Sequence, residues 1–361
     1  MAEKILMKGN EAIAVAAIRC GCDGYFGYPI TPQSEILETL TEMRPWDETG
    51  MVVLQAESET ASINMVYGGG ACGKKVMTSS SSPGVSLMCE GISYIAGAEL
   101  PCLLVNVVRG GPGLGTIQPS QSDYFQAVKG GGHGDYKMIV LAPASVQEMN
   151  DFVDMGFELA FKYRNPVMIL SDGIIGQMME KVELSPMKPR WTDEEIKKLH
   201  GSWATTGKDA DRNYNLITSL DLDAARQEKF NQKLQAKYRE IEKNEVRVEQ
   251  TLCDDAEYLI VAYGSSARVS QKAMELAHEE GIKVGLLRPI TLYPYPTAQI
   301  QALLPHLKGI LTVEMSAGQM IEDVRLAVEG KVPVEFYGRA GGMIPSPEEV
   351  LEAIKTKLVK K

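Results

Sequence analysis

Two carboxylates stand where a short apolar stretch of this chain gives way to a helical pattern. Residues 51–54 read Met-Val-Val-Leu, a continuous apolar run typical of a buried parallel strand, and Glu57 and Glu59 follow at the start of a helix. Ligands of open α/β sheets bind at the carboxyl ends of the strands. Side chains two residues apart on a helix point in nearly opposite directions, so we expect the two acids to differ in role, with Glu57 structural. The alternative is that both are first-turn acids stabilised by the helix dipole.

Thr31 follows another predicted strand, residues 24–27, within the sequence Tyr-Pro-Ile-Thr-Pro at 28–32. Proline fixes its own φ angle and restricts the residue before it, so Thr31 should be held in an extended conformation. The pattern also predicts a helix with Thr31 as its N-cap and Pro32 as its first residue. The hydroxyl of Thr31 is then either a simple cap or a group that faces the same crevice as Glu59.

Arg109 follows the clearest buried strand, residues 101–108, and a glycine-rich loop comes after it. A guanidinium there can offer two parallel donors to a carboxylate; the alternative is an ion pair with a local acid. A second loop, Ser-Ser-Ser-Ser-Pro-Gly at 79–84, either lets a ligand approach the backbone or forms a simple tight turn. The second loop is no P-loop and the first does not fit G-x-G-x-x-G, so these nucleotide-binding motifs are not indicated.

These residues lie in a regular alternation of predicted strands and helices, which predicts a parallel sheet covered by helices on both faces. Residues 181–250 are rich in mixed charge, hold a polar helix at about 222–245 and are typical of a linker. A second strand-and-helix unit begins near residue 256. We therefore predict an α/β chain with two parallel-sheet domains, residues 1–180 and the smaller 251–361, joined by the linker 181–250.

The composition excludes several classes of function. The 361 residues are 44% hydrophobic and 23% charged, with a net charge of −10 and no basic stripe, so nucleic acid is not an expected partner. No apolar run reaches the length of about 18 residues that indicates a membrane span. The six cysteines contain no Cys-x-x-Cys pair, and the N-terminus lacks a signal-peptide pattern. We expect a cytoplasmic protein with reduced thiols that holds no iron–sulfur cluster or structural zinc by itself.

The combination of motifs resembles the alpha chain of 2-oxoacid:ferredoxin oxidoreductases, which carries the pyrimidine-binding domain of a thiamine diphosphate enzyme. The segments that carry the resemblance are residues 27–32, Glu59 within Glu-Ser-Glu-Thr-Ala-Ser, the loop at 78–84 and Arg-Gly-Gly-Pro at 109–112. The second domain, with Gly-Ser-Ser-Ala-Arg at 264–268, resembles the transketolase C-terminal type. Residues 118–123 are most similar to the branched-chain type, which uses 3-methyl-2-oxobutanoate (ketoisovalerate); 2-oxoglutarate and pyruvate are the alternative substrates.

The resemblance implies roles for particular residues. Glu59 is the expected catalytic residue, because in the family this acid hydrogen-bonds N1′ of the cofactor's aminopyrimidine. Thr31 and Arg109 are expected to bind the 2-oxo acid, with Arg109 on its carboxylate. The resemblance also gives a set of residues that contact the cofactor: Pro29, Ile30, Glu59 and Ser82. It implies oxidative decarboxylation with coenzyme A as acyl acceptor and ferredoxin as electron acceptor.

The sequence departs from a complete enzyme of this kind in what it lacks. No Gly-Asp-Gly with a suitably spaced Asn is present, and no cluster-ligating cysteines are present, so we expect no metal site in this chain. In the family, a beta chain binds the diphosphate and Mg²⁺, and gamma and ferredoxin-like chains complete a hetero-oligomer with iron–sulfur clusters. Two rival classes are a thiamine diphosphate half-chain that passes no electrons and a non-catalytic scaffold subunit.

Overall fold

The larger sheet lies in the first part of the chain and is almost entirely parallel. The computed structural model describes residues 4–208, 210 and 212–359. The strand order of this sheet is β12-β6-β7-β5-β4-β2-β3, with β12 alone antiparallel to its neighbour. Its strands are β2 (Gly24–Gly27), β3 (Val52–Gln55), β4 (Val76–Ser80), β5 (Cys102–Val108), β6 (Ile139–Leu141), β7 (Pro166–Asp172) and β12 (Thr291–Tyr293).

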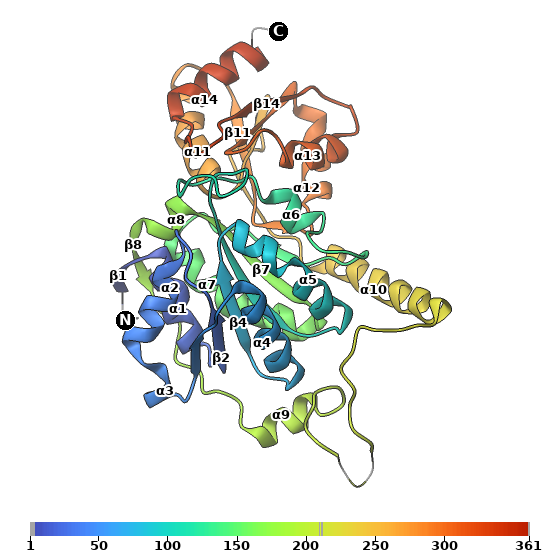
Figure 1. Ribbon diagram of the computed structural model, residues 1–361. Helices are drawn as coiled ribbons and strands as arrows, with labels where there is room; N and C mark the ends of the chain where they lie inside the picture. The colour runs from blue at the N-terminus through green and yellow to red at the C-terminus, as the bar shows by residue number, and fades with distance from the viewer. Residues whose placement is uncertain (1–3, 209, 211, 360–361) are drawn as a thin grey trace.

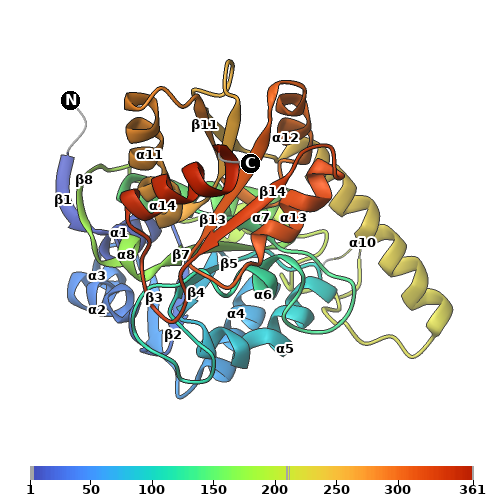
Figure 2. The ribbon, with the colours of Figure 1, turned by 90° about the horizontal axis from the view of Figure 1, so that it is seen from above.

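Helices cover both faces of this sheet, as the alternation predicted (Figures 1 and 2). One face carries α1 (Gly9–Arg19), which contacts both α2 (Ser34–Met43) and α7 (Val146–Tyr163). The other face carries α4 (Glu59–Ala71) packed against α5 (Pro83–Gly97). Short helices connect these layers: α3 (Pro45–Glu48), α6 (Tyr124–Val128) and α8 (Gly173–Gln177).

The smaller sheet has the order β14-β13-β10-β11-β9, and only β9 runs antiparallel to its neighbour. Figure 1 shows this second domain above the first. Its elements are β9 (Val248–Thr251), β10 (Tyr258–Val261), α11 (Gly264–Glu279), β11 (Val284–Pro289), α12 (Thr297–Leu303), η1 (Leu304–His306), β13 (Gly309–Glu314), α13 (Met320–Val328), β14 (Val334–Gly338), α14 (Pro347–Ala353) and η2 (Ile354–Val359). Here α11 packs against α14, and α12 packs against α13.

Two local expectations were wrong. Residues 51–54 are not a buried strand, because β3 is the edge of its sheet and leaves Val52 49% and Leu54 38% exposed. Thr31 is not an N-cap, since it lies in a turn and α2 begins only at Ser34.

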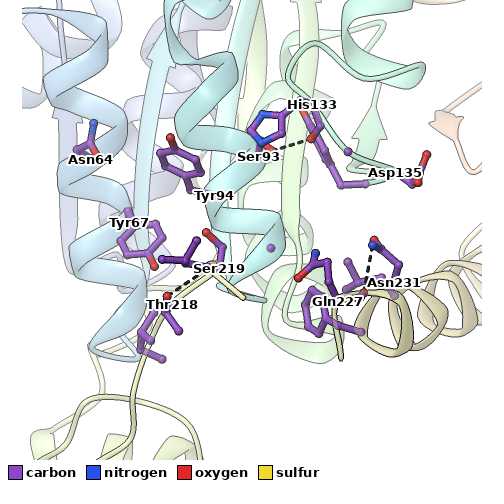
Figure 3. A pocket seen from close by; sticks show the side chains of 17 residues that line it. Asn64, Tyr67, Ser93, Tyr94, His133, Asp135, Thr218, Ser219, Gln227 and Asn231 are labelled. Atoms are coloured by element: carbon purple, nitrogen blue, oxygen red, sulfur yellow. Dashed lines mark hydrogen bonds between the residues drawn. The ribbon is translucent and has the colours of Figure 1, made fainter. Parts of the chain in front are cut away.

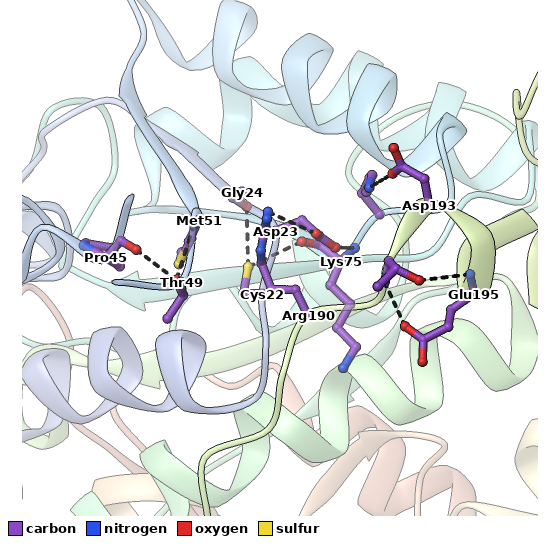
Figure 4. A network of polar contacts seen from close by, with 12 residues as sticks. Cys22, Asp23, Gly24, Pro45, Thr49, Met51, Lys75, Arg190, Asp193 and Glu195 are labelled. Atoms are coloured by element: carbon purple, nitrogen blue, oxygen red, sulfur yellow. Dashed lines mark hydrogen bonds and ion pairs between the residues drawn. The ribbon is translucent and has the colours of Figure 1, made fainter. Parts of the chain in front are cut away.

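The segment between the domains is attached along the first domain. It contains α9 (Asp193–His200) and α10 (Ala224–Asn244), which projects to one side in Figure 1. At the amino ends of the strands, Arg190 pairs with the buried Asp23 at 3.3 Å, and Asp193 pairs with Lys74 at 2.6 Å (Figure 4). Burial raises the pKa of Asp23, while its cationic neighbours act in the opposite direction. These contacts fix the path of the segment across the sheet end.

The two domains share strands and polar contacts. β12 joins the first sheet from the second part of the chain, and a small sheet pairs β1 (Lys4–Lys8) with β8 (Met179–Glu183). Arg288 makes two hydrogen bonds, of 2.7 and 2.9 Å, to Glu148 of α7. The buried Gln121 donates to the carbonyl of Tyr263 and accepts from the amide of Met315. The division at residues 180 and 250 therefore remains a proposal about folding units, because strand pairing and hydrogen bonds connect the parts of the chain on its two sides.

Within the part of the chain that the structure describes, no helix combines the length and apolar character needed to span a bilayer.

Candidate active site

The two acids that the sequence singled out, at the strand ends of the first sheet, differ in their exposure to solvent. Glu59 is the first residue of α4 and is only 6% exposed, whereas Glu57 is exposed. Ser58 is the N-cap, and its hydroxyl accepts a hydrogen bond of 3.2 Å from the amide of Ala61. The helix therefore starts with Glu59 turned inward, where the positive end of the helix dipole favours a carboxylate.

The carboxylate of Glu59 lies against the start of α5. A Cβ atom placed on Gly84 would lie 2.5 Å from Oε1 of Glu59 and 2.1 Å from Oγ of Ser80, so only glycine fits there. No hydrogen bond or ion pair to the Glu59 carboxylate is found among the described residues, and the buried hydroxyls of Ser80 and Ser81 also lack partners. Unpaired buried polar groups cost about 1–3 kcal/mol each. This cluster has the character expected of a site that hydrogen-bonds a polar ring such as an aminopyrimidine.

Arg109 follows β5 and is 9% exposed. Its two terminal nitrogens donate hydrogen bonds of 3.0 Å to the carbonyls of Thr31 and Leu114, and its Nε has no partner. No carboxylate of the described residues pairs with it, so the alternative of a local ion pair does not hold. The structure thus brings Arg109 and Thr31 together, but through the backbone of Thr31, whose side chain is exposed.

Ser82, just after β4, hydrogen-bonds the backbone of Arg109, just after β5. Its hydroxyl accepts from the amide of Arg109 at 3.1 Å and lies 3.3 Å from the carbonyl of the same residue. Its backbone has φ +28°, a left-handed value that favours glycine. Ser82 is therefore held in a strained conformation beside Arg109.

A cavity of about 670 Å³ opens at these strand ends, between the two domains. Ser82 and Arg109 line it from the first domain, and residues of the second domain close the other side: Ser316, Ala317, Gln319, Ala340 and Gly341. The remaining predicted residues are not part of its lining: Pro29, Ile30, Thr31 and Glu59. Glu59 instead adjoins the turn that leads from Ser82 to Gly84.

Asp123 also lines this cavity, and the sequence did not single it out. Asn106 of β5 donates a hydrogen bond of 2.9 Å to its carboxylate. Burial raises the pKa of Asp123, and the hydrogen bond from Asn106 acts against that rise. The available signal was Asn106 itself, a lone amide in an otherwise apolar strand.

A second cavity, of about 480 Å³, lies between α4, α5 and α10 (Figure 3). The exposed His133 lines it and contacts Tyr94 edge to face at 6.4 Å. Tyr67 of α4 also lines it, more than two helical turns beyond Glu59. This cavity is therefore separate from the Glu59 cluster. In the described ranges, no group of three or more His, Cys, Asp or Glu side chains is arranged to hold a metal ion.

Two family models match this chain, one over each part of the fold. The family model "Pyruvate flavodoxin/ferredoxin oxidoreductase, thiamine diP-bdg" matches residues 15–248, and "Pyruvate:ferredoxin oxidoreductase core domain II" matches residues 256–350. The fold and these two matches define the class of protein: an α/β subunit with a thiamine diphosphate-binding domain and a second core domain.

Full-length relatives make the assignment more specific. The chain is 52% identical to the ketoisovalerate oxidoreductase subunit VorB of Methanothermobacter thermautotrophicus over 97% of both chains. It is 35% identical to the 2-oxoglutarate synthase subunit KorA of Methanothermobacter marburgensis, over 98% of this chain and 99% of that one. The 2-oxoglutarate:ferredoxin oxidoreductase of Magnetococcus marinus, solved with 2-oxoglutarate, coenzyme A and succinyl-CoA, superposes with a TM-score of 0.86 at 28% identity, over 99% of this chain and 66% of that one. The chain belongs to the 2-oxoacid:ferredoxin oxidoreductase family, which confirms the predicted family and fold.

Proposed function

We propose that this chain is one subunit of an enzyme that oxidatively decarboxylates 3-methyl-2-oxobutanoate. The 2-oxo acid and coenzyme A give the branched acyl-CoA, CO₂ and a proton, and two electrons pass one at a time to ferredoxin. The 52% identity to a ketoisovalerate oxidoreductase subunit, against 35% to a 2-oxoglutarate synthase subunit, supports this substrate. 2-Oxoglutarate and pyruvate are the alternatives within the family.

The observation that carries the chemistry is that Glu59 is 6% exposed and that its carboxylate, which no described residue hydrogen-bonds, lies beside the unpartnered Ser80 hydroxyl. When bound, thiamine diphosphate supplies a nucleophilic carbon and an electron sink for decarboxylation. Glu59 then holds or accepts the proton at N1′ of the aminopyrimidine. The backbone at Pro29 and Ile30 and the turn at Ser82 are the proposed further contacts of the ring.

Arg109 is the proposed anchor for the carboxylate of the 2-oxo acid. Arg109 lines the cavity, and its buried Nε has no hydrogen-bond partner. A guanidinium can present Nε and one terminal nitrogen as two parallel donors. The carbonyl of Thr31 holds the other terminal nitrogen, so Thr31 fixes the orientation of the guanidinium.

This chain lacks the motif expected to bind the diphosphate and Mg²⁺, so partner chains must supply it. We propose a beta chain that binds the diphosphate and Mg²⁺, with gamma and ferredoxin-like chains that carry the iron–sulfur clusters, in a cytoplasmic hetero-oligomer. The outer side of α4 supports docking of the beta chain next to Glu59. Thr60, Asn64 and Gly68 are small and exposed there, and a Cβ atom on Gly68 would contact nothing. On the adjacent α5, Leu87 is 59% exposed.

The test is a substrate panel on the native complex, purified through a tag on this chain without oxygen. We expect viologen reduction that depends on coenzyme A and is faster with 3-methyl-2-oxobutanoate than with 2-oxoglutarate or pyruvate. A different preferred acid would keep the family and correct the substrate. Aldehyde formation without viologen reduction would favour the thiamine enzyme that passes no electrons, and a complex that binds no thiamine diphosphate would favour the scaffold.

A further inference from the structure

The strained turn at Ser82 is held by a side chain from the middle of the sheet. Asn106 lies in β5, between apolar residues, and is 1% exposed. Its Oδ1 accepts a hydrogen bond of 3.1 Å from the amide of Ser82. A non-glycine residue pays a conformational penalty at positive φ, so the strained turn persists only where its surroundings fix it.

The other end of the Asn106 amide is also fixed. Its Nδ2 donates a hydrogen bond of 2.9 Å to Oδ2 of Asp123, at the start of the segment that leads into α6. A carboxylate can only accept, so Asp123 determines which way the amide of Asn106 faces. With the amide turned the other way, its NH₂ group would oppose the amide of Ser82.

The chain of contacts ends at Arg109. Ser82 meets both backbone groups of Arg109 through its hydroxyl, so a shift of the turn at Ser82 displaces the residue that carries the guanidinium. Ser82, Arg109 and Asp123 all line the cavity between the domains, whereas Asn106 lies behind it. Asn106 thus links Asp123 to the turn at Ser82, and through that turn to Arg109, although Asn106 itself does not line the cavity.

We infer that Asn106, oriented by Asp123, fixes the turn at Ser82 and through it the position of Arg109. Asn106 and Asp123 are then positioning residues for the 2-oxo acid. The inference rests on the proposed role of Arg109 in binding the substrate carboxylate. The inference also explains why β5 contains the polar residue Asn106, since a buried amide in a sheet is tolerated only when its hydrogen bonds are made.

An exchange of the two side chains tests the pair. Asn106→Asp keeps the acceptor for Ser82 but sets a carboxylate against Asp123, so we expect the KM for 3-methyl-2-oxobutanoate to rise roughly tenfold with little change in kcat. Asp123→Asn should have a smaller effect. The double variant Asn106→Asp/Asp123→Asn restores one donor and one acceptor, and its KM should return to within about threefold of the wild-type value.

Hydrogen exchange supplies a readout that does not depend on turnover. In the purified complex, the amides of Ser82 and Arg109 should exchange faster in Asn106→Asp and recover in the double variant. The matched control is Asn165→Asp, which alters another fully buried amide, bonded to the carbonyls of Lys137 and Pro166 near the start of β7. We expect this control to leave KM and the exchange of both amides unchanged.

The outcomes separate this inference from the proposed function. If the double variant is no better than Asn106→Asp in KM and in exchange, the positioning pair is wrong. If exchange follows the expected pattern but Arg109→Lys leaves KM unchanged, the pair holds the turn and the substrate role of Arg109 is wrong. An unchanged KM in Asn106→Asp, together with a raised KM in Arg109→Lys, would overturn the inference and keep the proposed function.

Discussion

Two buried glutamates, one in each domain, lie close to the carboxyl end of a parallel strand and the start of a helix. Glu314 ends β13 and is fully buried; its carboxylate accepts hydrogen bonds from the Ser316 hydroxyl and from three backbone amides at the start of α13, at 2.9–3.0 Å. Glu59 opens α4 a few residues after the edge strand β3 of the first sheet, and no described residue hydrogen-bonds its carboxylate. Both glutamates thus lie between a strand and a helix, but only the carboxylate of Glu314 is hydrogen-bonded by described residues.

This difference shows which of two similar motifs is structural. All of the bonds that Glu314 makes are internal, and they order the loop that forms one wall of the cavity. Glu59 lies beside the buried hydroxyl of Ser80 across Gly84, and the hydroxyls of Ser80 and Ser81 remain without partners. Native proteins satisfy nearly all buried polar groups, so a cluster of unsatisfied ones marks a surface that something else completes.

The largest expected effect is on Glu59. Glu59→Gln keeps the size of the side chain but removes the acid, so we expect kcat of the complex to fall roughly 10²-fold or more, the usual scale for a positioned acid–base group. Steady-state viologen reduction with 3-methyl-2-oxobutanoate measures it. Turnover close to the wild-type value would remove Glu59 from the chemistry.

Gly84→Ala tests the position of the Glu59 carboxylate without changing the acid. The added methyl group would lie 2.5 Å from Oε1 of Glu59, so the carboxylate must move. We expect turnover to fall roughly tenfold to 10²-fold, because small displacements at a reacting group have large effects on rate. A variant that turns over normally would show that the packing of Glu59 against α5 does not matter.

Arg109→Lys should have a smaller effect, mainly on substrate binding. Lysine keeps the charge but loses the two parallel donors and the contacts to the carbonyls of Thr31 and Leu114. We expect the KM for the 2-oxo acid to rise roughly tenfold, with kcat less affected. Unchanged KM and kcat would place Arg109 outside the site.

The smallest effect on turnover is expected for Glu314→Gln, the counterpart of Glu59→Gln. An amide cannot satisfy all the donors that the carboxylate satisfies, so the free energy of unfolding should fall by about 1–3 kcal/mol. The rate per folded complex should stay near the wild-type value. Thermal unfolding and turnover, measured on the same preparation, compare the two effects; a loss of turnover like that of Glu59→Gln would remove the distinction between the two acids.

The sequence predicted the features that depend on local pattern. Periodicity and small residues were enough to find the apolar strands that lead to Arg109 and to the serine loop. The same signals located the strand that leads to Glu59. The order of strands in the sheet is not a local property, so β3 was expected to be buried although it forms the edge. The strands β1, β8 and β12 were missed for the same reason, because their partners are far away in the chain.

The site was predictable only in part. Glu59 and Arg109 carry their chemistry in their residue type and their place after a strand. The contact between Asn106 and Asp123, 17 residues apart, depends on how the loop after β5 returns over the sheet, and no sequence motif indicates it. Thr31 was expected to act through its hydroxyl, and the structure shows its carbonyl in contact with Arg109 instead.

Binding of thiamine diphosphate tests most directly the claim that this chain holds one half of a shared active site. Isothermal titration with thiamine diphosphate and Mg²⁺ would compare this chain alone, its beta chain alone and the two mixed. We expect the mixture to bind far more tightly than either chain, since the aminopyrimidine half and the diphosphate half of the site then meet. If either chain alone binds as tightly as the mixture, the site is not shared between them.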